Sequence, residues 1–508
     1  MDQGISGRPS TADEQPPATA GEETPSALRE WPLIAAMLAL AALIPLASGV
    51  ALPIVLAKAD NPTAALLPLT LTLLSILGAV VARRRLPGQA IRPRDEPELA
   101  ALVQDVAERL GFRAPLLVRV VPDVQASLSR STVSGIRAYV LVLGLPVLRT
   151  LTADQLAAVV AHELAHEQHV GHRRTSWLLL ARSALTAELR PRFRPLAPLA
   201  TPLLRATQPR VWRTETDSDA DAARLVGTAT TAAALERSIR LDALYEGLGL
   251  HWWHALGRHD GGTYPQDFYD ALDTALHDPH VVRSTVRAIA EHDALDPYAT
   301  ADHPPLARRL AALPTADAVT TYGDEPLPLR TGPALERWCV GQLAEQAKPR
   351  RARGARGTKN RAKAATPRPI PLLALPPDRL RQLLDDKGPF PLQQATRQDS
   401  PAQALTAALD AVSDGSWPRL ARRIEPGVRH QPASVRTAFA RTVLTGAMIL
   451  ALAPVLGDAG WTHPSRWRTS VLASPEGRVV DLSELLTAAV ENGDTAPVRA
   501  LLAAEVTA

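Results

Sequence analysis

The sequence contains little cysteine and few aromatic residues. Its 508 residues include one cysteine, Cys339, and aromatic side chains make up 4% of the chain. A single cysteine excludes a disulfide within the chain, which suits a reducing compartment. The formal net charge is only +4, too small to indicate a nucleic-acid partner. Apolar residues make up 46%, a share typical of a globular protein with membrane segments rather than a disordered chain.

The first 30 residues lack the basic stretch that begins a secretory signal peptide. They are rich in Pro, Gly, Glu and Thr, which predicts a disordered tail. Two uncharged segments follow at residues 31–57 and 64–82, each long enough to cross a bilayer. We expect a transmembrane helical hairpin over residues 31–82; the alternative is a pair of buried core helices.

Basic residues after the second segment predict the orientation of this hairpin. Only Lys58 lies in the turn, whereas residues 83–95 form a basic linker with Arg83, Arg84, Arg85, Arg92 and Arg94. Positive residues favour the cytoplasmic side of a membrane. We therefore expect a multi-pass protein of the plasma membrane whose following domain, residues 96–345, lies in the cytoplasm.

The pattern becomes globular after this linker. Residues 98–110 predict an amphipathic helix ended by Gly111, and residues 116–121 and 137–143 predict strands. The second strand is either an edge strand that pairs with an extended peptide or an ordinary internal strand. Residues 177–189 are apolar but interrupted by charge, which predicts an amphipathic segment at the membrane surface. The expected fold class is α+β, mostly α.

The most informative motif is His162-Glu163-Leu164-Ala165-His166. Histidines four apart share one face of a helix and can bind one metal ion, while the adjacent Glu163 can take a proton from water. Asp154 is a candidate cap for this helix. Two solvated histidines beside a glutamate are the alternative. His169 and His172 follow, and we expect them at a solvated helix end.

A catalytic zinc needs a third protein ligand from elsewhere in the chain. Asp217 and Asp221 are four residues apart, so one could bind the metal while the other orients a ligand histidine. Glu215 is the rival ligand, on roughly the opposite helical face from Asp217. The alternative is an acidic helix start without metal. We predict Asp217 as ligand and Asp221 as its supporting residue.

In motif order, the chain resembles the HtpX-type membrane zinc metalloproteases, the group that includes the CAAX prenyl endopeptidases. The resemblance rests on His162-Glu163-x-x-His166, on Asp217-Ser218-Asp219-Ala220-Asp221 and on His303-Pro304 with Arg309 six residues after the histidine. It covers residues 96–315. The chain departs from the family in having Asp217 where the second motif has Glu, and in lacking an Asn after the first strand.

The resemblance implies a zincin-like domain that holds one Zn²⁺ per chain. It implies that Glu163 is the general base and that His303 stabilises the oxyanion. The alternative is that His303 is an exposed histidine before a helix, without a catalytic role. Arg309 would support the site from behind. The implied activity is that of a membrane-anchored zinc endopeptidase whose substrates are unfolded or membrane polypeptides, in membrane protein quality control or regulated proteolysis.

The C-terminal part matches no pattern that indicates a function. Residues 346–369 are basic and carry no aromatic residue that could stack on bases, which favours a disordered linker near lipid headgroups. Residues 370–508 predict a mainly helical region with a short strand pair near residues 470–482. Residues 442–457 are apolar, and we expect a buried core helix there, with a third membrane span as the alternative.

Two other functions remain open on the sequence alone. One is a catalytically inactive membrane scaffold or sensor that retains the zincin fold. The other is a regulatory membrane metalloprotease of the antibiotic-sensor type. Nothing in the sequence indicates the oligomeric state, and no nucleic-acid partner is expected.

Overall fold

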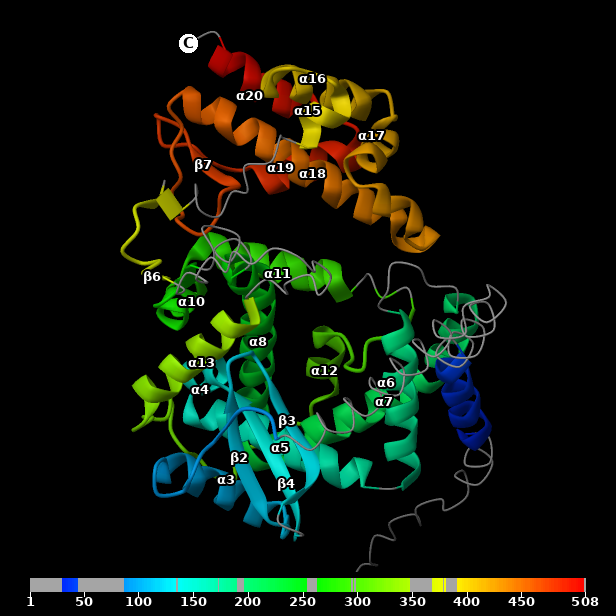
Figure 1. Cartoon of the computed structure of the whole chain (residues 1–508), viewed down its shortest axis with the longest axis vertical. Helices are drawn as coiled ribbons and strands as arrows, with labels where there is room; N and C mark the ends of the chain where they lie inside the picture. The colour runs from blue at the N-terminus through cyan, green and yellow to red at the C-terminus, as the bar shows by residue number, and fades with distance from the viewer. Residues whose placement is uncertain are drawn as a thin grey trace, which may run out of the picture.

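The computed structural model is a mainly helical α+β fold with small sheets, as the composition and periodicity predicted (Figure 1). It describes residues 30–43, 86–133, 136–171, 173–189, 196–253, 263–293, 298–347, 368–377 and 391–506, together with Asp296, Arg379 and Leu380. The second predicted membrane segment, most of the first, the arginines at 83–85 and nearly all of the basic linker 346–369 lie outside these residues.

Four strands form the sheet beside the candidate site. They are β1 (Gln89–Ala90), β2 (Leu116–Val121), β3 (Ala126–Val133) and β4 (Ile136–Gly144), arranged in the order β1-β2-β4-β3. The predicted strands at 116–121 and 137–143 are confirmed. β2 and β4 are parallel, whereas β3 is antiparallel to β4.

Of the two alternatives for residues 137–143, the structure shows the internal strand and not the edge strand. β4 lies between β2 and β3, so both of its sides are paired within the sheet. Among the described residues, the terminal strands of this sheet are β1 and β3. β3 was not predicted because its sequence, Ala-Ser-Leu-Ser-Arg-Ser-Thr-Val, carries few of the large apolar residues that mark a strand.

Helices α3 (Pro97–Arg109) and α5 (Ala153–Val170) pack on one face of this sheet. Side chains of β4 alternate between its two faces, as in any strand. Leu141 and Leu143 join the main core with both helices, whereas Val140 and Val142 form a small separate cluster on the other face. The predicted helix 98–110 corresponds to α3.

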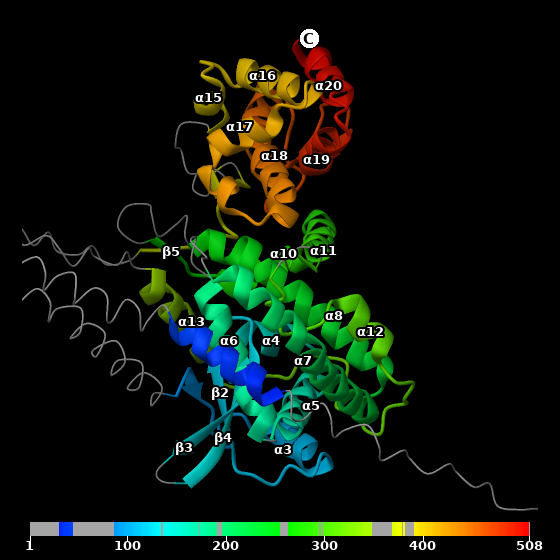
Figure 2. The ribbon, with the colours of Figure 1, turned by 90° about the vertical axis from the view of Figure 1, so that its right-hand side faces the viewer.

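A second group of helices packs around its own apolar cluster. Helix Glu30–Leu43 lies against α6 (Arg173–Leu189) and α7 (Ala197–Val226), and Figure 2 shows it in front of them. Ile34 and Met37 are almost fully buried there. A salt bridge from Glu30 to Arg174 at 3.1 Å adds a polar contact.

Shorter elements complete the main domain. They are α4 (Leu145–Thr150), α8 (Thr228–Leu244), the π-helix η1 (Tyr245–Gly249), β5 (Thr263–Pro265), α10 (Phe268–Leu276), α11 (Pro279–Asp293), α12 (Leu306–Ala312), α13 (Gly332–Ala347) and β6 (Arg368–Ile370). β5 and β6 form a parallel pair. Trp252 and Trp253 are buried against Phe268, so this aromatic pair serves packing.

The C-terminal region has a separate core. It contains α15 (Pro391–Thr396), α16 (Pro401–Ser413), α17 (Trp417–Ile424), the 3-10 helix η2 (Pro426–His430), α18 (Ala433–Asp458), β7 (Val471–Ala473), β8 (Val479–Asp481), α19 (Leu482–Asn492) and α20 (Ala496–Val506). The expected strand pair is present as β7 and β8. Leu444, Met448 and Leu452 of α18 are fully buried in this core, as the core-helix prediction requires.

Among the described residues, α18 is the one helix long and apolar enough to cross a membrane. Its burial in the C-terminal core means that this property is weak evidence for a span. Helix Glu30–Leu43 is apolar but shorter. The multi-pass arrangement predicted from the sequence is therefore treated below as a proposal.

Candidate metal centre

Helix α5 presents the residues of the His-Glu-x-x-His motif. Thr152 caps the helix: its hydroxyl accepts a hydrogen bond from the Gln155 backbone N–H, and the Gln155 side chain accepts one from the Thr152 N–H. The prediction that Asp154 is the cap is wrong, because this carboxylate instead accepts hydrogen bonds from the backbone N–H groups of Tyr322 and Gly323. These hydrogen bonds connect the start of α5 to the loop that contains Tyr322 and Gly323.

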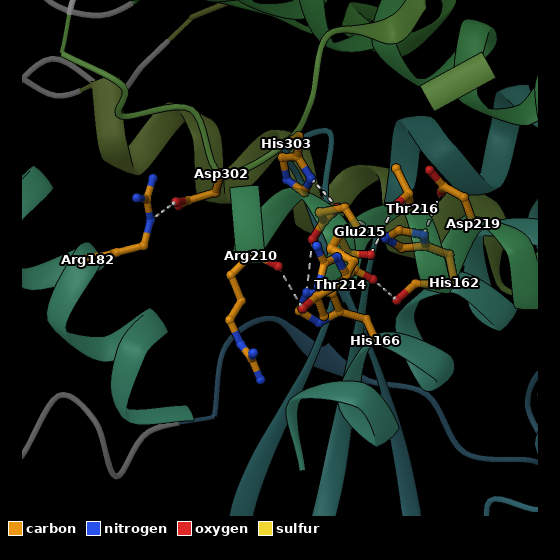
Figure 3. A network of polar contacts seen from close by, with 12 residues as sticks. His162, His166, Arg182, Arg210, Thr214, Glu215, Thr216, Asp219, Asp302 and His303 are labelled. Carbon is orange, nitrogen blue, oxygen red and sulfur yellow. Dashed lines mark hydrogen bonds and ion pairs between the residues drawn. The ribbon is translucent and has the colours of Figure 1, made fainter. Parts of the chain in front are cut away.

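Both motif histidines face one carboxylate on α7. His166 Nε2 lies 2.9 Å from Glu215 Oε1, and His162 Nε2 lies 3.6 Å from Glu215 Oε2 (Figure 3). Glu215 is only 3% exposed. The two helices pack closely along this stretch. The structure therefore brings together two histidines and a glutamate from segments about fifty residues apart.

The expected third ligand, Asp217, does not lie beside His162 and His166. It is exposed on the outer side of α7, and the described contacts of the histidines are with Glu215 and Asp219. The reason is helical geometry, since residues two apart point about 200° from one another. The prediction is corrected to Glu215. The signal was in the sequence, because Glu215 and Asp219 are also four apart and begin with the Glu that the resemblance requires.

Asp219, rather than Asp221, supports a ligand histidine. Its Oδ1 lies 2.9 Å from His162 Nδ1, the ring nitrogen on the side away from Glu215. This is an ion-pair distance rather than an aligned hydrogen bond. Asp221 lies two residues further along α7, on roughly the opposite face of the helix, and contacts His169 Nε2 at 2.7 Å. The supporting role predicted for Asp221 is therefore wrong.

Arg309 lies directly behind Asp219. Its Nε and Nη2 atoms donate hydrogen bonds to the two Asp219 oxygens at 2.8 and 2.7 Å. Arg309 and Asp219 are 7% and 1% exposed, so the pair is shielded from water. This bidentate contact fixes the orientation of the carboxylate that faces His162. The resemblance placed Arg309 in a supporting position, and the structure locates it there.

His303 approaches Glu215 from the solvent side. Its Nδ1 lies 2.6 Å from Glu215 Oε2, and its side chain is 66% exposed. The loop before it is anchored by Arg182, a fully buried residue of α6 whose Nη2 donates to the Ala299 carbonyl at 3.1 Å. Trp212 Nε1 donates to the Ala301 carbonyl at 3.2 Å. Sequence reasoning did not identify either anchor.

The buried carboxylates set the electrostatics of the site. Burial opposes the charged form of His162, but Asp219 and Glu215 outweigh it and raise the pKa of His162 to about 10. Burial raises the pKa of Glu163, and the neighbouring histidines partly oppose this rise. The Glu215 carboxylate raises the pKa of His303.

The donor set fits zinc better than a harder metal ion. Two imidazoles and one carboxylate are zinc ligands, whereas calcium and magnesium prefer oxygen atoms alone. Ligand atoms on one tetrahedral zinc lie about 3.4 Å apart, and the His–Glu distances of 2.9 and 3.6 Å bracket that value. As they stand, no three His, Cys, Asp or Glu side chains among the described residues are arranged to hold a metal.

Comparison with known proteins yields no match. No family model, no curated protein and no solved structure matches this chain.

Proposed function

We propose that the chain is a membrane-anchored zinc endopeptidase. The observation that carries this proposal is the convergence of His162 and His166 on Glu215, with Glu163 on the same helix. These three residues would hold Zn²⁺ through two nitrogens and a carboxylate, which leaves a position for water. The ion would lower the pKa of that water and polarise the scissile carbonyl.

Glu163 fits the role of general base in this proposal. Burial raises its pKa, which makes its carboxylate a better proton acceptor than an exposed glutamate. It would take a proton from water and later deliver it to the leaving amine. His303 is exposed on the open side, where a protonated ring can donate a hydrogen bond to the developing oxyanion.

Asp219 and Arg309 would orient a ligand histidine without contacting the metal. A carboxylate beside the second nitrogen of a ligand histidine fixes the tautomer and the orientation of the ring. Asp219 is 2.9 Å from His162 Nδ1, and Arg309 holds this carboxylate through both of its oxygens. Neither residue needs to touch a substrate to affect zinc affinity.

Strand β3 is the natural place for a peptide substrate. It is one of the two terminal strands of the sheet among the described residues, and it packs beside α5. A terminal strand offers unpaired backbone groups to an extended peptide. A salt bridge of 2.5 Å between Arg130 of β3 and Glu167 of α5 links this strand to the candidate metal helix.

The surface of the second helix group supports membrane anchoring. Several large apolar side chains are exposed there: Trp31, Leu43, Trp177, Leu180 and Leu199. Arg182, the charge that interrupts the apolar sequence of α6, is fully buried and does not reach this surface. An apolar surface with tryptophans is typical of contact with a bilayer. The cytoplasmic location of the zinc site remains part of the proposal.

The proposed substrates are unfolded or membrane polypeptides. The test is to measure the zinc content of the purified full chain and its cleavage of a casein-like substrate, before and after removal of metal by a chelator. We expect one zinc per chain, loss of cleavage with the metal and recovery when zinc is restored. Stoichiometric zinc without cleavage would favour the inactive scaffold, and absence of zinc would refute the proposal.

A further inference from the structure

The C-terminal region carries a concentrated patch of arginines far in sequence from the zinc site. We name it the arginine patch; it consists of Arg397, Arg419, Arg422, Arg423 and Arg429, all exposed. Three of these lie on α17, one on η2 and one directly after α15. These elements contact one another, so the patch is one continuous surface.

Two adjoining hollows lie within the arginine patch. The larger has a volume of about 410 Å³ and is lined by Arg397 and Arg423. The smaller has a volume of about 300 Å³, with Arg419, Arg422, Arg423 and Arg429 in its wall. Arg423 belongs to both, so an anion in one hollow would lie close to an anion in the other.

The chain neutralises only part of the positive charge of the arginine patch. Among the described residues, none of its five arginines forms a salt bridge with a carboxylate. Two carboxylates lie nearby: Glu425 caps η2, and the pKa of Asp414 is lowered by its hydrogen bond with Ser416 and by the charge of Arg419. An excess of like charge opposes folding, so an external anion would stabilise this surface.

Arg397 occupies a backbone position that glycine usually fills. Its φ is +58°, at the left-handed end of α15, where the Gln398 N–H donates back to the Gln393 carbonyl. A side chain makes this backbone conformation less favourable than the ordinary right-handed one. The arginine therefore stands at an unfavourable position while its side chain lines the larger hollow.

We propose that the arginine patch binds the anionic headgroups of phospholipids at a membrane surface. Guanidinium groups pair with phosphate and carboxylate oxygens, and the headgroup of phosphatidylserine presents both with a net negative charge. No aromatic side chain lines either hollow, so bases of a single-stranded nucleic acid would find nothing to stack on. Clusters of four to eight basic residues are typical of lipid headgroup recognition.

The position of the arginine patch agrees with this partner. In Figure 1, α17 and helix Glu30–Leu43 both lie toward the right-hand side, and Figure 2 turns that side toward the viewer. These two elements therefore lie toward the same side of the molecule. A membrane contacted by the first could also be contacted by the second.

The test uses the full chain in nanodiscs, so that the apolar helices are inserted in every sample. Hydrogen exchange of α17 and η2 is measured in discs of phosphatidylcholine alone and in discs that also contain phosphatidylserine. We expect slower exchange with phosphatidylserine, by about fivefold for each arginine engaged, and a loss of this protection at high salt. Equal exchange in the two discs would overturn the proposal.

A charge variant and a matched control isolate the arginine patch. Arg419→Gln, Arg422→Gln and Arg423→Gln together should abolish the protection, whereas the same change at the exposed residues Arg113, Arg330 and Arg478 should leave it intact. Unchanged exchange of the buried part of α18 would show that the variant is folded. Protection that survives in the variant would contradict the proposal.

Two further probes separate the sources of phosphate. Inorganic phosphate and a single-stranded RNA oligonucleotide are each added to discs of phosphatidylcholine alone. We expect neither to reproduce the protection seen with phosphatidylserine. Equal protection by inorganic phosphate would assign the patch to a free anion, and protection by RNA alone would assign it to nucleic acid; either result overturns a lipid partner. Proteolysis is not measured, so the result is independent of the zinc site.

Discussion

Arg309 and Asp219 form two parallel hydrogen bonds, 2.8 and 2.7 Å long, across 90 residues of sequence. Both side chains are nearly fully buried, and Asp219 faces the ring of His162 on its other side. The pair therefore joins the helix after the His303 loop to the helix that carries Glu215. Its geometry should affect zinc affinity without any contact with the metal.

Arg309→Lys is expected to weaken zinc binding. Lysine keeps the charge but cannot form two parallel hydrogen bonds, so Asp219 would lose its fixed orientation. Loss of such a supporting contact typically lowers metal affinity by about 10–100-fold. Competition with a chromogenic chelator measures the affinity. Arg330→Lys is the control, because Arg330 is 62% exposed, and equal affinities in both variants would contradict the supporting role.

Variants of Glu215 and Asp217 distinguish the two candidates for the third zinc ligand. Glu215→Gln should reduce zinc affinity by more than about 100-fold, because it removes a ligand rather than a supporting residue. Asp217→Asn should bind zinc like the unmodified chain, since Asp217 is exposed on the other side of α7. Zinc content by mass spectrometry distinguishes them. Loss of zinc in Asp217→Asn alone would mean that α7 is rotated relative to the structure.

Arg182→Met is expected to destabilise the loop that carries His303. Arg182 donates hydrogen bonds to the carbonyls of Leu204 and Ala299, and each buried acceptor left without a donor costs about 1–3 kcal/mol. The free energy of unfolding in urea should fall accordingly, whereas Arg213→Met, at an exposed site on α7, should change it little. An unchanged unfolding midpoint in Arg182→Met would show that this anchor contributes nothing.

Membrane topology provides a test away from the active site. A reporter fused after residue 95 should be found on the cytoplasmic side, because five arginines at 83–94 oppose the single Lys58 in the preceding turn. Protease accessibility on intact cells gives an independent measurement. A zinc domain exposed outside the cell would mean that the segments at 31–57 and 64–82 do not both span the membrane.

Local patterns in the sequence predicted the elements that frame the site. The abundance of Val and Leu identified β2 and β4, and the spacing of His162 and His166 placed both on one face of α5. These features are local, so the sequence displays them directly. Strand β3 was missed because it carries few large apolar residues.

The register of α7 could not be obtained in the same way. Glu215, Asp217, Asp219 and Asp221 supply two alternative pairs four residues apart, one on each side of the helix. Packing against α5 selects the pair Glu215 and Asp219, because it buries Ser218 and Ala222 beside them. Likewise, the contact of Arg182 with the His303 loop spans 117 residues and follows no local pattern. Such relationships depend on the tertiary structure.

The central claim is tested most directly by Glu163→Gln in the purified full chain. Glutamine keeps the size of the side chain but cannot accept the proton, so the variant should retain zinc and lose cleavage of a casein-like substrate by orders of magnitude. Glu108→Gln, at an exposed position of α3, should cleave normally. Cleavage by Glu163→Gln at the rate of the unmodified chain would contradict the proposed protease.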